Sequence, residues 1–325
     1  MILPLAPGAR PARVLPYYWR AATAACGDDL PTTTFPTDNS VQLPSGLRLA
    51  YRDWGGEGRP IVLVHGLASS YRIWDFVGPR LSQGLRVVAL DQRGHGRSDR
   101  PEATFDFGTY VADLREFMES LSLDRPVLVG HSWGGNVVLQ FGVDEPAHTA
   151  GLVLVDGGFL EISGRPGWTW ERARQELAPP QLDGLTRDEL LARASQGDLG
   201  GIWSPAVADA LLGHFEQLSD GRVRPWLRRE HHMRILRALW EHHPSQLWSR
   251  LRCPVLMVPA RRPNAEGRQA EMLAAKEAAV NLAESRLTRG QTLWMEDSIH
   301  DIPLQRPAEL AAAIAEFAAS NAVWR

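Results

Sequence analysis

The sequence of 325 residues predicts an α/β protein with a mostly parallel, doubly wound β-sheet. Short continuous apolar runs recur along the chain, as expected for strands buried on both faces of such a sheet. Segments with helical spacing separate these runs, and this alternation places helices on both faces of the sheet. Polar and glycine-rich residues follow several runs, at the strand ends where sites of open α/β sheets lie.

The first expected element is a β-hairpin over 41–51, because apolar and polar residues alternate on both sides of Pro44-Ser45-Gly46. The further expected strands are 61–64, 86–90, 127–129, 151–155, 254–258 and 291–295. The expected helices are 71–81, 109–121, the segment that starts after Ser132, 269–287 and 307–317.

The alternation of strands and helices is interrupted between 159 and 250. This segment is helical in pattern and broken by prolines, and it holds six of the twelve tryptophans. Because it lies between two strands of one sheet, we expect a helical cap over 159–250, inserted into an α/β core formed by 40–158 and 251–325. Residues 1–39 lack periodicity and are expected to form a loosely ordered extension without a signal-peptide core.

The composition argues against several classes of partner. A net charge of −3 indicates neither nucleic-acid nor membrane-surface electrostatics, and no apolar run has the length of a membrane span. Two cysteines, Cys26 and Cys253, do not form a disulfide framework. We therefore expect a cytoplasmic protein that acts on a small-molecule substrate, with no indication of its oligomeric state.

The most informative stretch is Gly130-His131-Ser132-Trp133-Gly134, between an apolar run and a helical segment. A strand that turns at once into a helix strains its corner residue and crowds its neighbours, so glycines are needed on both sides. This G-x-S-x-G arrangement predicts a nucleophile elbow with Ser132 as nucleophile.

A second stretch, His65-Gly66-Leu67, follows the expected strand 61–64. A glycine there lets backbone N–H groups point into a cavity. The N–H groups of Leu67 and Trp133 are the candidate oxyanion hole, since two preorganised donors stabilise charge on a carbonyl oxygen. We interpret His65 itself as a structural residue that holds the loop.

Two further features indicate no cofactor or metal. The loop from Asp91 to Asp99 is rich in glycine, but it has neither a P-loop ending nor a dinucleotide fingerprint, so we interpret it as structural. The histidines of the inserted segment lack the H-E-x-x-H spacing of a helical zinc site. The candidates weighed for such a site are His231, His232, His242 and His243, which lie near Glu230 and Glu241.

Together, the motifs H-G-L-A-S-S, D-Q-R-G-H-G-R-S-D, G-H-S-W-G-G and I-H-D-I-P-L resemble those of the α/β-hydrolase fold family. The resemblance covers about Val41 to Val323. It implies the chain order nucleophile, acid, histidine. Ser132 matches the nucleophile position and His300 the histidine position, so that His300 would take the serine proton and return it to the leaving group.

The sequence departs from the family at the acid. Most members carry Asp after the strand equivalent to 255–258, but that position falls near Pro263 here. Two candidates remain. Asp156 resembles the acid of the haloalkane-dehalogenase branch, and Glu266 lies further along the usual loop. We favour Asp156 and keep Glu266 as the alternative.

The resulting hypothesis is a serine hydrolase that cleaves a carboxylic ester, or a related acyl bond, of a small apolar substrate. The dehalogenase and epoxide-hydrolase branches use Asp as nucleophile, and an alkyl-enzyme on serine would be an ether that water does not readily cleave. Two alternatives stay open. One is a catalytically weak ligand-binding or signalling protein, and the other is a cofactor-free perhydrolase or haloperoxidase.

Overall fold

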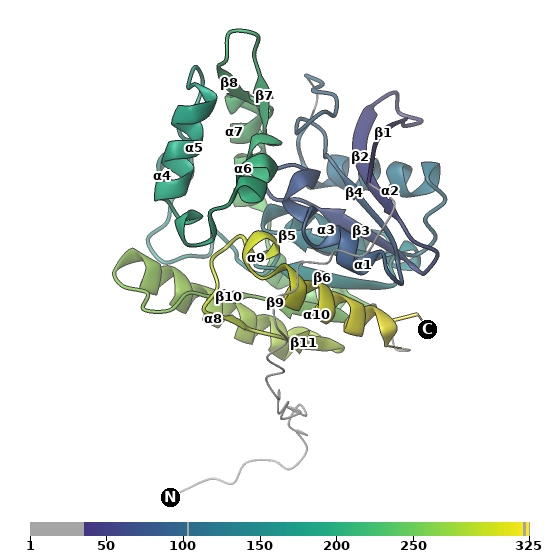
Figure 1. Ribbon diagram of the computed structural model, residues 1–325. Coiled ribbons are helices and arrows are strands. Elements are labelled where there is room, and N and C mark those ends of the chain that lie inside the picture. The colour runs from purple at the N-terminus through teal and green to yellow at the C-terminus, as the bar shows by residue number, and fades with distance from the viewer. Residues whose placement is uncertain (1–35, 103, 321–322, 325) are drawn as a thin grey trace, which may run out of the picture. The chain divides into compact units, whose positions relative to one another are not determined.

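The computed structural model describes residues 36–102, 104–320 and 323–324. Nearly all of the extension predicted over 1–39 therefore lies outside the described residues. The described part contains an eight-stranded sheet with the order β1-β2-β4-β3-β5-β6-β9-β11 (Figure 1). Its strands are β1 Thr37–Gln42, β2 Arg48–Gly55, β3 Pro60–Val64, β4 Arg86–Leu90, β5 Val127–His131, β6 Gly151–Val155, β9 Val255–Val258 and β11 Gly290–Thr292.

The sheet is mostly parallel, as predicted. The hairpin β1–β2 pairs antiparallel with itself and then antiparallel with β4. All the pairs from β4 to β11 run parallel. Consecutive parallel strands need crossover connections, and helices supply most of them. The carboxyl ends of β3, β5, β6 and β9 therefore meet at one edge.

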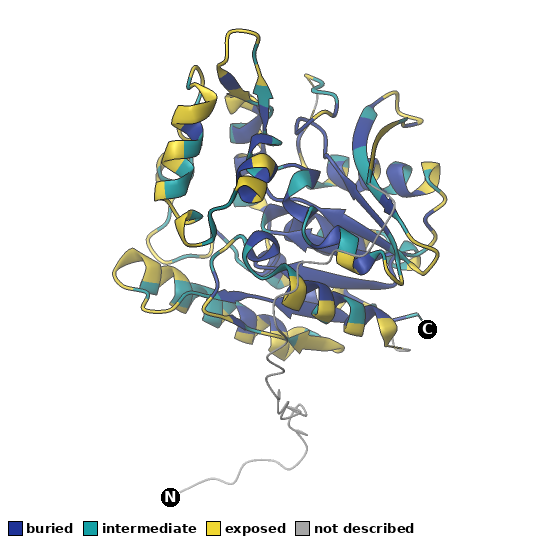
Figure 2. Cartoon of the chain, in the orientation of Figure 1, coloured by how far each residue is buried: buried dark blue, intermediate teal, exposed yellow. Residues whose placement is uncertain are grey.

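Helices cover both faces of the sheet. The buried residues of α2, α3 and α8 pack with one set of strand side chains. Those of η1, α1 and α10 pack with the alternate set. These helices are η1 Tyr71–Trp74, α1 Gly78–Leu81, α2 Phe107–Ser120, α3 Trp133–Asp144, α8 Arg268–Arg286 and α10 Pro307–Ala319. Figure 2 shows the central strands of the sheet between them in the colour of buried residues.

Two predicted elements are wrong in detail. The helix expected over 71–81 is a 3₁₀ helix and a separate short α-helix, because Gly78 and Pro79 start a new helix rather than continue one. The strand expected over 291–295 is divided into β11 and β12 Met295–Glu296. β12 leaves the main sheet and pairs with β10 Ala260–Arg261.

The segment between β6 and β9 is helical in large part, as its pattern indicates. Its helices are α4 Trp170–Glu176, α5 Arg187–Gln196, α6 Pro205–Leu212 and α7 Arg229–Glu241. A small antiparallel pair, β7 Phe215–Gln217 with β8 Val223–Pro225, was not predicted. Three-residue strands are too short for a periodic signal. In Figure 1 these elements lie together at the upper left, whereas α8 and α10 run along the bottom.

Polar contacts join the inserted segment to the core. Ser70 Oγ lies 2.9 Å from His214 Nδ1, and Arg72 forms an ion pair with Asp209. Ser70 and Arg72 lie shortly after the loop His65-Gly66-Leu67. The insertion is thus attached beside one half of the expected oxyanion hole.

The tryptophans of the insertion mainly serve packing. Trp248 is fully buried, whereas Trp168 and Trp226 lie under arginine guanidinium groups. Trp170 contacts both Trp240 and Arg237. Packing contacts of the described residues therefore account for these five tryptophans.

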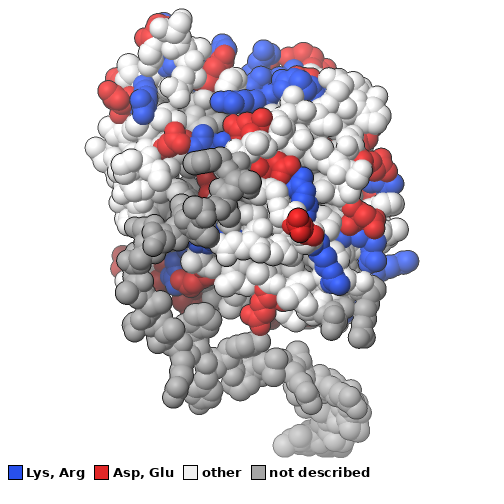
Figure 3. Space-filling view, turned by 45° about the vertical axis from the view of Figure 1, so that its right-hand side comes forward, with Lys and Arg blue, Asp and Glu red and all other residues white. Residues whose placement is uncertain are grey.

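The surface in Figure 3 carries acidic and basic side chains close together, with no large area of one sign. Ion pairs of the described residues include Arg86 with Asp53 at 2.6 Å and Arg52 with Asp75 at 2.7 Å. Among the described residues, no helix combines the length and the apolar character that crossing a membrane requires.

Close backbone contacts at the β5–α3 corner explain its glycines. A Cβ on Gly130 would lie 2.3 Å from the carbonyl oxygen of Gly134. A Cβ on Gly134 would lie 2.5 Å from the carbonyl oxygens of Val64 and His65. Backbone cannot move aside as a flexible side chain can, so helix α3 crosses the sheet this closely only because these residues are glycines.

The corner predicts a large difference between two Gly→Ala variants. Gly134→Ala should lower the free energy of unfolding by roughly 2–3 kcal/mol, because its methyl group overpacks the backbone of β3. Gly84→Ala is the control, since a Cβ there meets nothing within 4 Å, and its effect should be near zero. Urea unfolding of both variants measures this, and equal stabilities would contradict the packing argument.

Candidate active site

Ser132 stands at the corner between β5 and α3. Its backbone angles, φ 53° and ψ −126°, are unusual for a residue with a side chain, and such a conformation costs on the order of 1–3 kcal/mol. The N–H of Ser132 donates to the carbonyl oxygen of Val155 on the neighbouring strand at 2.9 Å. Its hydroxyl does not cap the helix, so the strained turn leaves the hydroxyl at the edge of the sheet.

His300 and Asp156 form a close pair. The distance between His300 Nδ1 and Asp156 Oδ2 is 2.6 Å. A carboxylate can only accept, so Nδ1–H donates and Nε2 faces away from Asp156. Asp156 directly follows β6, and His300 lies in the loop after β12. Residues 144 positions apart thus meet at the predicted edge.

Ser132 belongs to the same edge. Val155 and Gly157, the two neighbours of Asp156, both lie against the backbone of Ser132. A Cβ on Gly157 would lie 1.9 Å from the carbonyl oxygen of Ser132. His131, the residue before Ser132, has its ring 4.8 Å from that of His300, and its Nε2 donates to the His300 carbonyl oxygen at 3.0 Å. Ser132 Oγ forms no hydrogen bond with His300 among the described residues. Catalytic hydrogen bonds are often long without substrate.

The charges of the pair support each other. Burial works against ionisation of Asp156, but the hydrogen bond and charge of His300 and the ammonium of Lys276 lower its pKa to about 2. Surrounding protein atoms disfavour the charged form of His300, yet the hydrogen bond and charge of Asp156 outweigh this and raise the pKa of His300. The arrangement suits an imidazole that accepts a proton, because Asp156 stabilises the imidazolium that forms at His300.

The two backbone N–H groups predicted for the oxyanion hole are available. Trp133 is the first residue of α3, so its N–H has no partner within the helix. Among the described residues, the N–H of Leu67 donates no hydrogen bond either. A Cβ on Gly66 would lie 3.0 Å from Ser132 Cβ, so the loop that carries Leu67 packs directly against the serine.

His65 holds its loop, as interpreted from the sequence. Its Nδ1 lies 2.7 Å from the carbonyl oxygen of Gly66, and its Nε2 accepts the N–H of Gln92 at 3.1 Å. Both ring nitrogens are therefore used by backbone. Burial lowers the pKa of His65 to about 3, which keeps the imidazole neutral.

The loop after β4 is also structural, as interpreted. The carboxylate of Asp91 accepts the N–H of Tyr71 at 2.7 Å and that of Arg97 at 2.9 Å. A Cβ on Gly96 would lie 1.9 Å from Asp91 Oδ2. The glycine thus admits the carboxylate into the loop and does not form a phosphate cradle.

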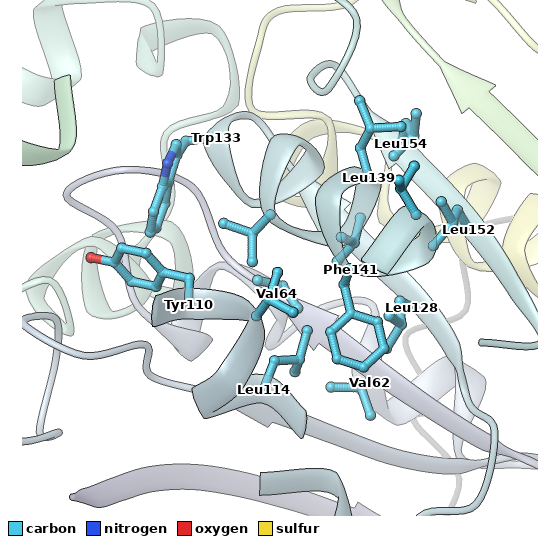
Figure 4. Packing of buried hydrophobic residues seen from close by; sticks show 14 of the residues in the cluster. Val62, Val64, Tyr110, Leu114, Leu128, Trp133, Leu139, Phe141, Leu152 and Leu154 are labelled. Atoms are coloured by element: carbon cyan, nitrogen blue, oxygen red, sulfur yellow. The ribbon is translucent and has the colours of Figure 1, made fainter. Parts of the chain in front are cut away.

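The side chain of Trp133 packs into the core and is 3% exposed. It stacks on His95 and meets Tyr110 edge-on, as Figure 4 shows for the pair Trp133 and Tyr110. The Trp133 side chain therefore belongs to the core.

The alternative acid lies elsewhere. Glu266 is exposed just before α8, and among the described residues it forms no hydrogen bond or ion pair with His300. The loop of Pro263 and Asn264 borders a cavity of about 360 Å³ together with Glu277 and Asp297. Ser132, Asp156 and His300 do not line that cavity. Of the two acids weighed from the sequence, the structure brings only Asp156 to the histidine.

The histidines of the inserted segment do not gather into one cluster. His242 lies between Asn136 and Gln140, and His243 contacts Glu161. Glu102, Glu230 and His231 do lie together, with possible ligand atoms within 4.8 Å of one another. Arg228 and Arg234 lie 3.4 Å and 3.8 Å from Glu102, so positive charge already adjoins that carboxylate.

Three residues near the pair were given no role from the sequence. They are Lys276, His131 and His214. Lys276 contacts Asp156 and His131 contacts His300. His214 lies close enough that its charge would lower the pKa of His65, and the charge of His131 would lower the pKa of His214. The single available signal was that Lys276 is the only lysine in the sequence.

Comparison with known proteins identifies the family. A model described as the alpha/beta hydrolase family matches residues 61–313. The chain belongs to the α/β-hydrolase family. Its mostly parallel sheet and the strand–serine–helix corner agree with this assignment, which confirms the resemblance found in the motifs.

Individual relatives place the chain among enzymes of this family. It is 42% identical over 201 residues to a non-heme chloroperoxidase from Streptomyces lividans, covering 54% of this chain and 71% of that protein. It is 37% identical over 112 residues to a soluble epoxide hydrolase from a Corynebacterium strain, covering 34% and 39%. The crystal structure of E-2-(acetamidomethylene)succinate hydrolase matches with a TM-score of 0.69 and 20% identity, over 88% of this chain and all of that one. These findings support a hydrolase on this fold.

The electrostatics of this α/β hydrolase predict how its histidines titrate. The pKa of His300 should lie above its ordinary value of about 6.5, whereas burial should keep His65 and His131 neutral down to about pH 4. NMR of protein labelled with ¹³C-histidine measures this, with His300→Gln to assign its signal. An His300 that titrates below pH 6 would contradict the pairing with Asp156.

Proposed function

We propose that the protein is a serine hydrolase that cleaves a carboxylic ester of a small apolar substrate through an acyl-enzyme. The observation that carries the proposal is the pair of the buried Asp156 with the half-exposed His300, at 2.6 Å, beside the strained corner of Ser132. A nucleophile, a base and an orienting carboxylate at one edge of a sheet are the parts that this chemistry requires.

Each residue then has a defined task. His300 Nε2 takes the hydroxyl proton of Ser132 as the oxygen attacks the ester carbonyl. The N–H groups of Leu67 and Trp133 stabilise the oxyanion of the tetrahedral intermediate. His300 returns the proton to the leaving alcohol, and a water activated by the same imidazole hydrolyses the acyl-enzyme. Asp156 keeps Nδ1–H oriented and stabilises the imidazolium.

The serine decides between the reactions of related branches. An acyl-enzyme on Ser132 is an ester, which water attacks at a carbonyl carbon. Epoxide opening by a serine would leave an ether without such a carbon. Similarity to an epoxide hydrolase is therefore compatible with a different reaction here, and acyl transfer is the chemistry that a serine nucleophile favours.

We infer further that the segment 159–250 acts as the cap of this site. Its contacts from His214 and Asp209 reach Ser70 and Arg72, close to the loop of Leu67. Its elements would then exclude water from the acyl-enzyme and select small substrates. The mixed surface charge in Figure 3 gives no reason to expect a highly charged polymer as substrate.

Substitutions at the site should reduce ester hydrolysis in a characteristic order. Ser132→Ala and His300→Gln should lower kcat by about 10⁴-fold or more, because each removes the nucleophilic attack. Asp156→Asn should lower kcat by roughly 10²- to 10⁴-fold, because the amide mis-orients the imidazole. Hydrolysis of p-nitrophenyl acetate and butyrate measures these effects.

Glu266→Gln is the matched control for the acid and should retain wild-type turnover, since Glu266 makes no contact with His300. A large loss in Glu266→Gln combined with an active Asp156→Asn would reassign the acid. Turnover by Ser132→Ala equal to wild type would reject the serine mechanism.

A cofactor-free perhydrolase or haloperoxidase activity is the second candidate, because the chain is 42% identical to a non-heme chloroperoxidase over 201 residues. In that reaction hydrogen peroxide replaces water in the attack on the acyl-enzyme. The peracid that forms can oxidise halide to hypohalous acid and become a carboxylate again. The same Ser132, His300 and Asp156 would serve both reactions.

The two candidates differ in their response to peroxide. If the protein is foremost an esterase, adding hydrogen peroxide, acetate and bromide should give little bromination of monochlorodimedone relative to its ester turnover. A perhydrolase should brominate at a rate comparable to its ester hydrolysis, and Ser132→Ala should abolish both activities. Bromination that persists in Ser132→Ala would exclude an acyl-enzyme route for it.

A further inference from the structure

Both oxygens of the Asp156 carboxylate are occupied. Oδ2 accepts from His300, and Oδ1 accepts from Lys276 Nζ at 2.6 Å and from the N–H of Ala260 at 2.9 Å. The side chain of Asp156 is only 2% exposed. A carboxylate this deeply buried needs such partners, because an unpaired buried charge is very costly.

Lys276 contacts the carboxylate from α8, at the oxygen that His300 does not use. Its side chain is 16% exposed, and its ammonium also donates to the carbonyl oxygen of Ala260 at 2.9 Å. Ala260 is the first residue of β10, two positions after the end of β9. The ammonium therefore links the end of β6, the strand β10 and helix α8.

We propose that Lys276 is a positioning residue of the active site, which holds Asp156 Oδ1 so that Oδ2 remains directed at His300. The proposal rests on the proposed function, in that Asp156 serves as the acid of that site. It assigns a task to the only lysine in a chain whose other basic residues are arginines and histidines.

The geometry explains why an ammonium suits this position. Asp156 has a positive φ of 42°, a backbone conformation that is rare for a residue with a side chain. Two donors on Oδ1 prevent the carboxylate from rotating and exchanging its oxygens. An ammonium meets one oxygen as a compact charge, whereas a guanidinium tends to bind both oxygens and would compete with His300.

Lys276 also moderates the charge that His300 experiences. The charged and titratable groups that face the imidazole are Asp156 from β6, Asp301 beside it, His131 from β5 and Lys276 from α8. Asp156 and Asp301 favour the imidazolium, whereas Lys276 opposes it. Removing the ammonium should therefore leave the imidazolium too stable, so that His300 releases its proton only at higher pH.

The test compares Lys276→Met with Arg268→Met, which removes one positive charge from the same helix without touching Asp156. In Lys276→Met the midpoint of the His300 titration, measured by ¹³C-histidine NMR, should rise by about one pH unit. The acidic limb of the kcat/KM profile for p-nitrophenyl acetate should move with it. Turnover at the optimum should fall between about 10-fold and 100-fold as the carboxylate loses its orientation. Arg268→Met should change none of these.

Two more variants keep the test decisive if Lys276→Met folds poorly. Lys276→Gln retains an N–H donor but no charge, and should raise the His300 titration in the same way. Lys276→Arg retains the charge, so the titration should stay near that of wild type while turnover falls. An His300 titration that is unchanged in both neutral variants, or shifted equally in Arg268→Met, would overturn the proposal.

The NMR titration separates this proposal from the proposed function. If the wild type hydrolyses no ester but the neutral Lys276 variants shift the His300 titration, the function fails and the positioning role stands. If the wild type hydrolyses esters and these variants titrate and react like it, the positioning role alone fails. Thermal unfolding identifies a purely structural effect, which would lower stability without moving the titration.

Discussion

The burial of one carboxylate is the constraint on which the rest of this site depends. Asp156 is removed from water almost completely, and such a charge is tolerated only with several well-placed donors. Its three partners come from different parts of the chain: Ala260 from β10, Lys276 from α8 and His300 from the loop after β12. The Asp156 side chain thus connects the end of β6 to β10, to α8 and to the loop of His300, all of which follow the inserted segment. The loop of His300 lies next to Ser132 as a consequence of this bonding.

Local features of the sequence were sufficient to predict the core and the corner. Buried parallel strands are continuous apolar runs, so β3 to β6 and β9 are visible without tertiary information. The glycines around Ser132 are visible because the crowding they relieve arises between residues close in sequence and one neighbouring strand.

The prediction of one helix over 71–81 failed because a local break was overlooked. The apolar residues of this segment face one core, but Gly78 and Pro79 restart the helix, and periodicity alone does not register that break.

The acid could not be decided from the sequence, because its identity depends on reach through space. Asp156 and Glu266 both follow strands whose carboxyl ends lie at the same edge of the sheet as Ser132. Nothing in the sequence near either residue specifies which one faces His300. The structure shows that backbone shortly after β9 contacts both Asp156 and Lys276. The N–H of Ala260 donates to Asp156, and its carbonyl oxygen accepts from Lys276. Asp156, which lies one strand away at the end of β6, is thereby supported by the chain that follows β9. Lys276 had no local signal at all beyond being a single lysine.

The surrounding histidines show how the site keeps one proton acceptor distinct. Burial lowers the pKa of His65 and of His214 to about 3 and that of His131 to about 4. Each of these rings is used as a neutral hydrogen-bonding group: His65 within its own loop, His214 toward Ser70 and His131 toward the His300 carbonyl oxygen. Of these four rings, only His300 has a carboxylate as hydrogen-bond partner, so among them it alone gains basicity. Because neighbouring positive charges would oppose an imidazolium at His300, the neutrality of the other three rings is a condition for its role. The desolvation that makes Asp156 costly to bury therefore also selects which imidazole takes the proton.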